Sequence, residues 1–226
     1  MAKASTPAAA AATTPTTAPA VTANALRAYQ IERPDADGVA VIASRFKYLP
    51  GHPRQIRFDA KAGVFNYGGE KVIGNTLTFL PVALRVFEDD ILSMGRKLWA
   101  EVFFVDESGA VCAVLFHGYS VENLQKLNSA LFYDDLELSQ VTLTARATRK
   151  ENKQGKGFYY IAEFSYTPAD PVEVQARQQF AEDHALYREE TLTGTADVRL
   201  VNGYRLPAGY EAHQAPHRAQ LAEAIA

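Results

Sequence analysis

Cations and aromatic rings alternate over residues 144–160, and such a mixture could bind a polyanion. Residues 144–158 hold five Lys or Arg side chains against the single acid Glu151, a local excess of four positive charges. Cations contact phosphates and flat rings stack on bases of any sequence, so the combination is typical of proteins that bind single-stranded nucleic acid. The residues that we predict to make such contacts are Arg146, Arg149, Lys150, Lys153, Lys156, Tyr159 and Tyr160.

A second excess of four positive charges lies over residues 43–61, where five cations outnumber Asp59. Aromatic residues again stand among the cations. Because both stretches combine the same residue types, we expect them to line one groove. From this stretch the predicted contacts are Arg45, Lys47, Tyr48, Arg54 and Arg57.

Trp99 and Phe103 complete the candidates, because alternation along residues 98–105 places both rings on one face of an expected strand. If exposed, these rings would stack on bases. Aromatic pairs on strands also pack in hydrophobic cores, and a lysine-rich turn is also typical of a solvated loop. Both interpretations stay open for these residues.

The sequence shows no motif for catalysis or metal binding. No glycine-rich loop is followed by Lys and Ser or Thr, as a phosphate-binding loop requires. Acidic pairs at 89–90 and 134–135 stand at expected element boundaries, where Asp commonly forms caps and turns, and no ligand cluster accompanies His213 and His217. We therefore predict that the protein is not an enzyme and has no catalytic residue, metal site or cofactor.

The composition is that of a globular protein: of 226 residues, 47% are apolar and 22% are charged, and the formal net charge is −3. This charge excludes a uniformly basic protein, so contacts with nucleic acid must come from local patches. The single cysteine, Cys112, excludes an intramolecular disulfide and fits a reducing compartment. No stretch approaches the roughly 18 apolar residues of a membrane helix. We expect a cytoplasmic protein with no membrane partner.

Short apolar runs with β-branched and aromatic residues predict a mainly β protein. Between residues 76 and 166 the expected order is strand, strand, strand, helix, strand, strand, with Ser120 as the N-cap of a helix at 120–133. This is the order of the OB-fold, a five-stranded Greek-key barrel that binds oligonucleotides. The expected strands are 76–87, 98–105, 110–117, 136–149 and 158–166.

The rest of the chain is expected to flank this OB-like barrel. Asp170 and Pro171 predict the start of a helix that runs over 171–190. Asn202 and Gly203 predict the turn of a short hairpin after that helix. The predicted segments are a disordered Ala/Thr/Pro tail at 1–26, an N-terminal β extension at 27–75 packed on the barrel, the barrel at 76–167, the C-terminal helix and hairpin at 168–210, and a flexible tail at 211–226.

The segment from Phe65 to Phe164 resembles phage and mobile-element single-stranded DNA-binding proteins with an OB-fold. The resemblance lies in "GVFNYGG", "RKLWAEVFFVDESGAVCAVLFHGYS" and "ENKQGKGFYYIAEF". It implies sequence-tolerant binding of single-stranded DNA in replication, recombination or annealing, in a bacterial cell or a phage-infected host. Many bacterial members end in an acidic tip that recruits partners, whereas this chain ends in "HQAPHRAQLAEAIA".

We therefore expect a non-catalytic, largely sequence-independent protein that binds single-stranded DNA, with RNA as the other nucleic acid to test. The helix at 171–190 would then join subunits in a homo-oligomer or contact a replication or recombination protein. The main alternative is a structural or assembly protein of a phage or mobile element, in which the basic hairpin is a subunit contact. A metal-dependent nuclease ranks last.

Overall fold

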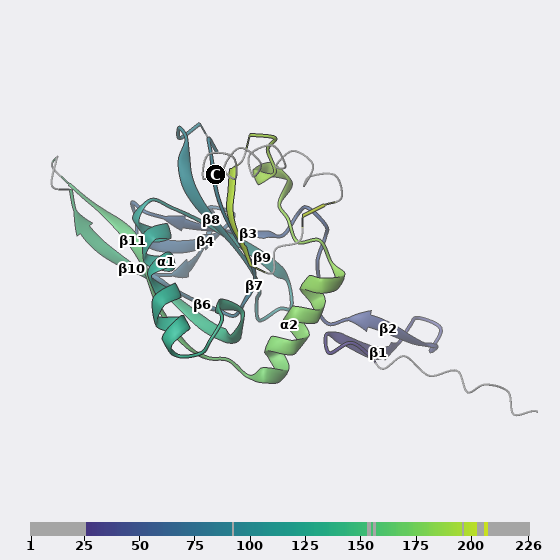
Figure 1. The fold of residues 1–226 in the computed structure, drawn as a ribbon. Coiled ribbons are helices and arrows are strands. Elements are labelled where there is room, and N and C mark those ends of the chain that lie inside the picture. The colour runs from purple at the N-terminus through teal and green to yellow at the C-terminus, as the bar shows by residue number, and fades with distance from the viewer. Residues whose placement is uncertain are drawn as a thin grey trace, which may run out of the picture.

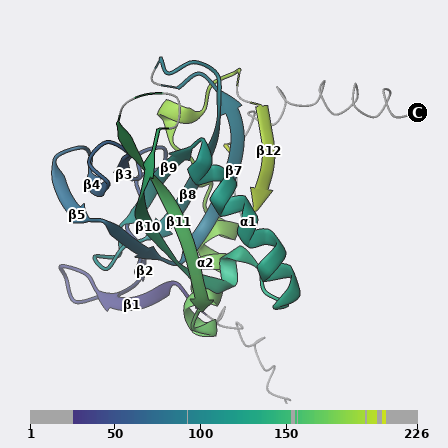
Figure 2. The ribbon, with the colours of Figure 1, turned by 90° about the vertical axis from the view of Figure 1, so that its left-hand side faces the viewer.

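A computed structural model describes residues 26–91, 93–152, 155, 157–195, 197–202 (backbone only) and 206–207 of the chain. In this part the protein is mainly β, as predicted, with two α-helices and three sheets. Figures 1 and 2 show a body of curved sheets, and Figure 1 shows one β-hairpin projecting from each side of that body.

The largest sheet has seven strands, and it contains the predicted hairpin of residues 98–105 and 110–117. All its pairs are antiparallel except β3 with β9, which are parallel. In spatial order the strands are β12 (Asp197–Asn202), β7 (Pro81–Asp89), β8 (Lys97–Val105), β9 (Val111–His117), β3 (Arg54–Asp59), β4 (Val64–Tyr67) and β5 (Lys71–Gly74).

A second sheet has three strands, β11 (Phe158–Pro168), β10 (Val141–Glu151) and β6 (Thr76–Phe79), in that order. Only Asn75 separates β5 from β6, and only Leu80 separates β6 from β7. One bent stretch of chain therefore supplies strands to both sheets. The register of β7 against β8 shifts between Pro81 and Ala83, at the proline, which has no amide to donate to the ladder.

Helix α1 (Tyr119–Tyr133) joins the two sheets in one hydrophobic core. Its buried leucines and valine recur at three- and four-residue spacing, which places them on one face of the helix. The prediction of Ser120 as N-cap was wrong, because Gly118 occupies that position. The Ser120 hydroxyl instead accepts a hydrogen bond of 3.0 Å from the amide of Ala162. This bond fastens the start of α1 to β11.

The expected five-stranded barrel is not closed in the described part of the chain, whose strands form open sheets. The edge of β9 is occupied by β3, with Arg54 opposite Cys112 and Ile56 opposite Val114. Among the described strands, β11 pairs with β10 alone. A single backbone bond of 2.7 Å, from the amide of Tyr160 to the carbonyl of Ala60, connects β11 to the turn between β3 and β4.

Helix α2 (Pro171–Asp183) packs against a second hydrophobic cluster, which contains Phe103 and Phe180. Asp170 caps it as predicted, accepting a hydrogen bond of 2.9 Å from the amide of Val172. The helix ends at Asp183, earlier than the predicted residue 190. The chain turns extended at His184 because Leu186 enters the same cluster. The buried apolar residues of α2 are Val174, Ala176, Phe180 and Ala181.

After α2 the chain crosses β7 and β8 and covers a buried ion pair. Nη2 of Arg85 lies 3.1 Å from a carboxylate oxygen of Glu101, and both side chains are inaccessible to solvent. Thr191 donates to the other Glu101 oxygen at 2.7 Å and accepts from Arg85 at 2.9 Å through its carbonyl. Two short 3₁₀ helices complete the helical elements, η1 (Leu138–Gln140) and η2 (Glu189–Thr191).

The third sheet is a separate hairpin of β1 (Gln30–Pro34) and β2 (Ala40–Ser44). Strand β1 was not predicted, because Glu32 and Arg33 interrupt its apolar pattern. The predicted tails at 1–26 and 211–226 lie almost wholly outside the described residues. The turn residue Gly203 of the predicted C-terminal hairpin also lies outside them, and so does its second strand up to residue 205. β12, the first strand of that prediction, pairs instead with β7.

Cys112 is fully buried on β9, and burial raises the pKa of its thiol to about 12. The thiolate is the form that reacts with alkylating reagents, and it is scarce at such a pKa. We expect iodoacetamide to leave Cys112 unmodified in the native protein at mildly alkaline pH and to modify it fully after unfolding. Intact-mass spectrometry measures both states, and rapid modification of the native chain would contradict the buried position.

Candidate nucleic-acid interface

The hairpin of β10 and β11 carries most of the first group of predicted contacts. Its strands are paired along their whole length, from Val141 opposite Pro168 to Glu151 opposite Phe158. The end of this hairpin extends beyond the body of the protein (Figure 1). Residues directly opposite each other share a face of the sheet, so Arg149 shares one face with Tyr160, and Lys150 shares the other with Tyr159.

On the first face a cation and two rings form a row. The guanidinium of Arg149 lies 4.0 Å from the ring centre of Phe158, a cation–π contact. The Phe158 ring meets Tyr160 edge to face, with 5.9 Å between ring centres. Phe158 is 50% exposed. The row therefore exposes a charged group and part of an aromatic residue to solvent.

Gly63 fixes the position of this row relative to the β3–β4 turn. A Cβ atom at Gly63 would lie only 2.6 Å from the Tyr160 ring, and the residue has a φ of 71°, which favours glycine. The ring of Tyr160 thus packs directly on the backbone of the turn. This contact brings the turn residue Lys61, which is exposed, beside the hairpin.

On the opposite face, Glu163 forms an ion pair with one cation of β10. The Lys150 ammonium lies 2.9 Å from one Glu163 oxygen, and the Thr148 hydroxyl donates to the other at 3.0 Å. These hydrogen bonds, chiefly that of Lys150, lower the pKa of Glu163. Arg146 is directly opposite Glu163 in the strand register. A single carboxylate therefore offsets the charge of this face.

A shallow hollow of about 450 Å³ lies beside Arg146 on the three-stranded sheet. Thr144 and Thr78 share a hydroxyl hydrogen bond of 3.2 Å on the same surface. Hydroxyl groups and an exposed guanidinium can donate hydrogen bonds to phosphate oxygens. The hollow is lined by Asn75, Thr76, Thr144, Arg146, Glu163, Phe164 and Ser165.

In the second predicted group, Arg45 contacts α2 and the Tyr48 hydroxyl is bonded to the chain that follows α2. Arg45 forms an ion pair of 2.9 Å with Glu173 of that helix. The Tyr48 hydroxyl accepts hydrogen bonds from the amides of Gly51 and Tyr187, and burial raises its pKa. The structure thus corrects the prediction that the Tyr48 ring faces nucleic acid.

The other cations of this group, Lys47, Arg54 and Arg57, are exposed. Arg54 forms an ion pair of 2.8 Å with Asp106, and Lys47 pairs through its backbone with Ala110. Arg54 also lines a hollow of about 460 Å³, with Gln55, Tyr67, Gly68 and Lys71. This hollow shares no residue with the one beside Arg146. Arg54 and Arg146 therefore line separate hollows, and the two basic groups approach each other at the β3–β4 turn.

Trp99 and Phe103 are in the interior, with 2% and 0% of their surface exposed. The indole of Trp99 donates a hydrogen bond of 2.9 Å to the carbonyl of Asp89, and Phe103 packs in the cluster of α2. Both faces of β8 are covered, one by the core and one by α2 and the chain that follows it. The prediction that these two rings stack on bases is therefore corrected.

Two predicted contacts, Lys153 and Lys156, lie outside the described residues. Two residues that the structure adds to the surface are Phe158 and Lys61. Alternation along β11 could have identified Phe158, because it shares a face with Tyr160. Lys61 could not be placed from sequence, since its position depends on the contact between Gly63 and Tyr160.

Among the described residues, no group of three or more His, Cys, Asp or Glu side chains could hold a metal ion. Within the described ranges, no helix is long and apolar enough to cross a membrane.

The arrangement is able to bind an anion and to stack flat groups. No protein-family model, curated protein or solved structure matches this chain.

Proposed function

We propose that the protein is a non-catalytic, largely sequence-independent single-stranded DNA-binding protein that acts in replication, recombination or annealing. The observation that supports this most directly is the row of Arg149, Phe158 and Tyr160 on the projecting hairpin. A base can stack on the exposed ring of Phe158 while the neighbouring guanidinium contacts a phosphate. Neither contact depends on base identity.

The strand connectivity supports an OB-like relationship. The bent stretch of β6 and β7 pairs with β8 through β7 and with β10 through β6. Helix α1 lies between the third and fourth strands of this series, as it does in the OB-fold. We propose an OB-like module that is opened because β3 occupies the edge of β9.

Glu163→Gln is expected to strengthen binding, because it frees Lys150 and removes a negative charge from the proposed surface. Since exposed ion pairs contribute up to about 1 kcal/mol, the gain in affinity should reach at most about fivefold. Glu32→Gln is the matched control, since it makes the same change of charge on β1, across the body from the hairpin (Figure 1). Equal effects of both substitutions on the measured Kd would contradict the assigned surface.

Fluorescence anisotropy of a labelled thymidine 30-mer tests the proposal directly. We expect saturable binding at low salt that an unlabelled single strand reverses and an equal amount of duplex does not. A uridine 30-mer in the same assay compares RNA with DNA. The oligonucleotide should stay intact when Mg²⁺ or Mn²⁺ is added, and its cleavage would replace the proposal with a nuclease.

Absence of binding at low salt would overturn the proposal. The basic hairpin would then be assigned to protein assembly, the alternative that the sequence left open.

A further inference from the structure

The β1–β2 hairpin projects from the side of the body opposite the β10–β11 hairpin (Figure 1). It forms a two-stranded sheet of its own. Its apolar residues Ile31, Val39 and Ile42 are exposed. A two-stranded hairpin is at best marginally stable in water unless it packs on something else.

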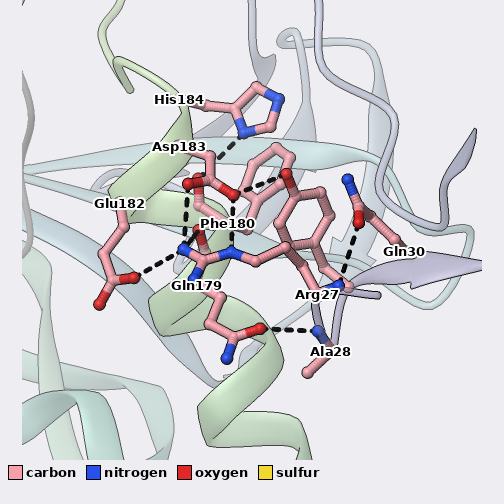
Figure 3. Close-up of polar contacts among 9 residues, drawn as sticks. Arg27, Ala28, Gln30, Gln179, Phe180, Glu182, Asp183 and His184 are labelled. Atoms are coloured by element: carbon pink, nitrogen blue, oxygen red, sulfur yellow. Dashed lines mark hydrogen bonds and ion pairs between the residues drawn. The ribbon is translucent and has the colours of Figure 1, made fainter. Parts of the chain in front are cut away.

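The base of this hairpin is fixed to the end of α2 (Figure 3). Arg27 bonds both oxygens of Asp183, at 2.9 and 3.0 Å, and one oxygen of Glu182 at 2.7 Å. The amide of Ala28 donates to the Gln179 side chain at 2.6 Å. The hairpin is thus anchored at its root while its strands stand clear of the body.

Hydrogen bonding within the hairpin shows which backbone groups point outward from β2. The amide of Asp35 donates a hydrogen bond of 2.9 Å to the carbonyl of Val39, and the amide of Arg45 donates one of 3.0 Å to the carbonyl of Tyr29. Bonded positions alternate along an antiparallel ladder, so Val41 and Ala43 also bond to β1. The backbone groups of Ala40, Ile42 and Ser44 therefore point away from β1, and among the described strands none pairs with this edge.

The two edges of the hairpin differ in their protection against pairing. On β1 the outward positions include Glu32 and Pro34, and charge and proline both block strand addition. Strand β2 reads "AVIAS", with neither a charge nor a proline, and Ile42 at its centre is 62% exposed. Such an edge is open to pairing with another strand.

We propose that β2 pairs antiparallel with β2 of a second copy of this chain, about a twofold axis at Ile42. The edge is self-complementary, because Ile42 then exchanges two backbone hydrogen bonds with its counterpart, and Ala40 does so with Ser44. The two Ile42 side chains meet at the axis with no like charges opposed. The result is a four-stranded sheet that joins two protomers.

The test is the mass of the full-length protein, measured by light scattering over a wide range of concentrations. The wild type is expected to be a dimer. Ile42→Pro removes the outward amide at the axis, and Ile42→Lys opposes two positive charges there, so both variants should be monomers. Ile31→Lys is the control, since Ile31 is an exposed residue whose backbone bonds point toward β2; this variant should remain a dimer.

Cross-linking tests the register. Ile42→Cys should form a disulfide with its counterpart under mild oxidation, while Ala40→Cys and Ser44→Cys should cross-link only when the two variants are mixed. A wild type that is monomeric at every concentration would overturn the proposal. The proposal would also be overturned if Ile42→Pro and Ile42→Lys both left a dimer intact and Ile42→Cys formed no cross-link.

Discussion

Phe158→Ala is expected to weaken binding of a thymidine 30-mer roughly 5- to 150-fold, since stacking on one ring contributes about 1–3 kcal/mol per base. The substitution removes the exposed ring and also the platform on which the Arg149 guanidinium lies. Phe158→Tyr keeps the ring and should bind as the wild type does. Anisotropy titrations at constant salt measure all three affinities.

Tyr133→Ala is the matched control for this prediction. Tyr133 is 81% exposed at the end of α1, so it presents an accessible ring away from the proposed surface. Its loss should leave the affinity unchanged. If Phe158→Ala has no effect, or if both substitutions weaken binding equally, the hairpin is not the site of stacking.

Glu101→Gln is expected to lower the free energy of unfolding by about 3–5 kcal/mol, because it leaves the buried charge of Arg85 without its counter-charge. Arginine stays charged at every accessible pH, so Arg85 keeps its buried charge in this variant throughout. Denaturant unfolding measures the loss of stability, and Glu122→Gln on the exposed face of α1 is the control for loss of a carboxylate.

Arg85→Met should behave differently, because the remaining Glu101 can take up a proton. Burial raises the pKa of Glu101 above its ordinary value of 4.5, against the opposing effect of Arg85, and removal of Arg85 raises it further. When a carboxyl group has a higher pKa in the folded state than in the unfolded state, the protein loses stability as the pH rises between these two pKa values. Arg85→Met should therefore be most destabilised in the more alkaline buffers. Equal destabilisation at all pH values would contradict a buried carboxylate at Glu101.

Periodicity predicted the elements whose partners are close in sequence. The alternation of β8 and β9 and the spacing of Leu124 and Leu127 in α1 depend only on local pattern, and these elements are found where predicted. The pairing of β3 with β9 joins residues more than fifty positions apart, and it occupies one edge of β9. No local pattern encodes that competition for an edge.

The same distinction applies to the candidate site. The hairpin register places Arg149 opposite Tyr160, so these two residues could be grouped from sequence alone. The burial of Trp99 could not be predicted, because alternation assigns a residue to a face but does not show what covers that face. Tyr48 was misassigned for a similar reason, since its hydroxyl is bonded to chain that follows α2.

The salt dependence of affinity for the thymidine 30-mer tests the central claim most directly. A single-strand binder that neutralises about four phosphates should show a slope of log affinity against log salt near −3, at roughly 0.7 per phosphate. Changing Arg146, Arg149 and Lys150 together to alanine should make this slope shallower by about 2. A wild-type slope near zero, or an unchanged slope in the triple variant, would contradict binding of single-stranded DNA through this hairpin.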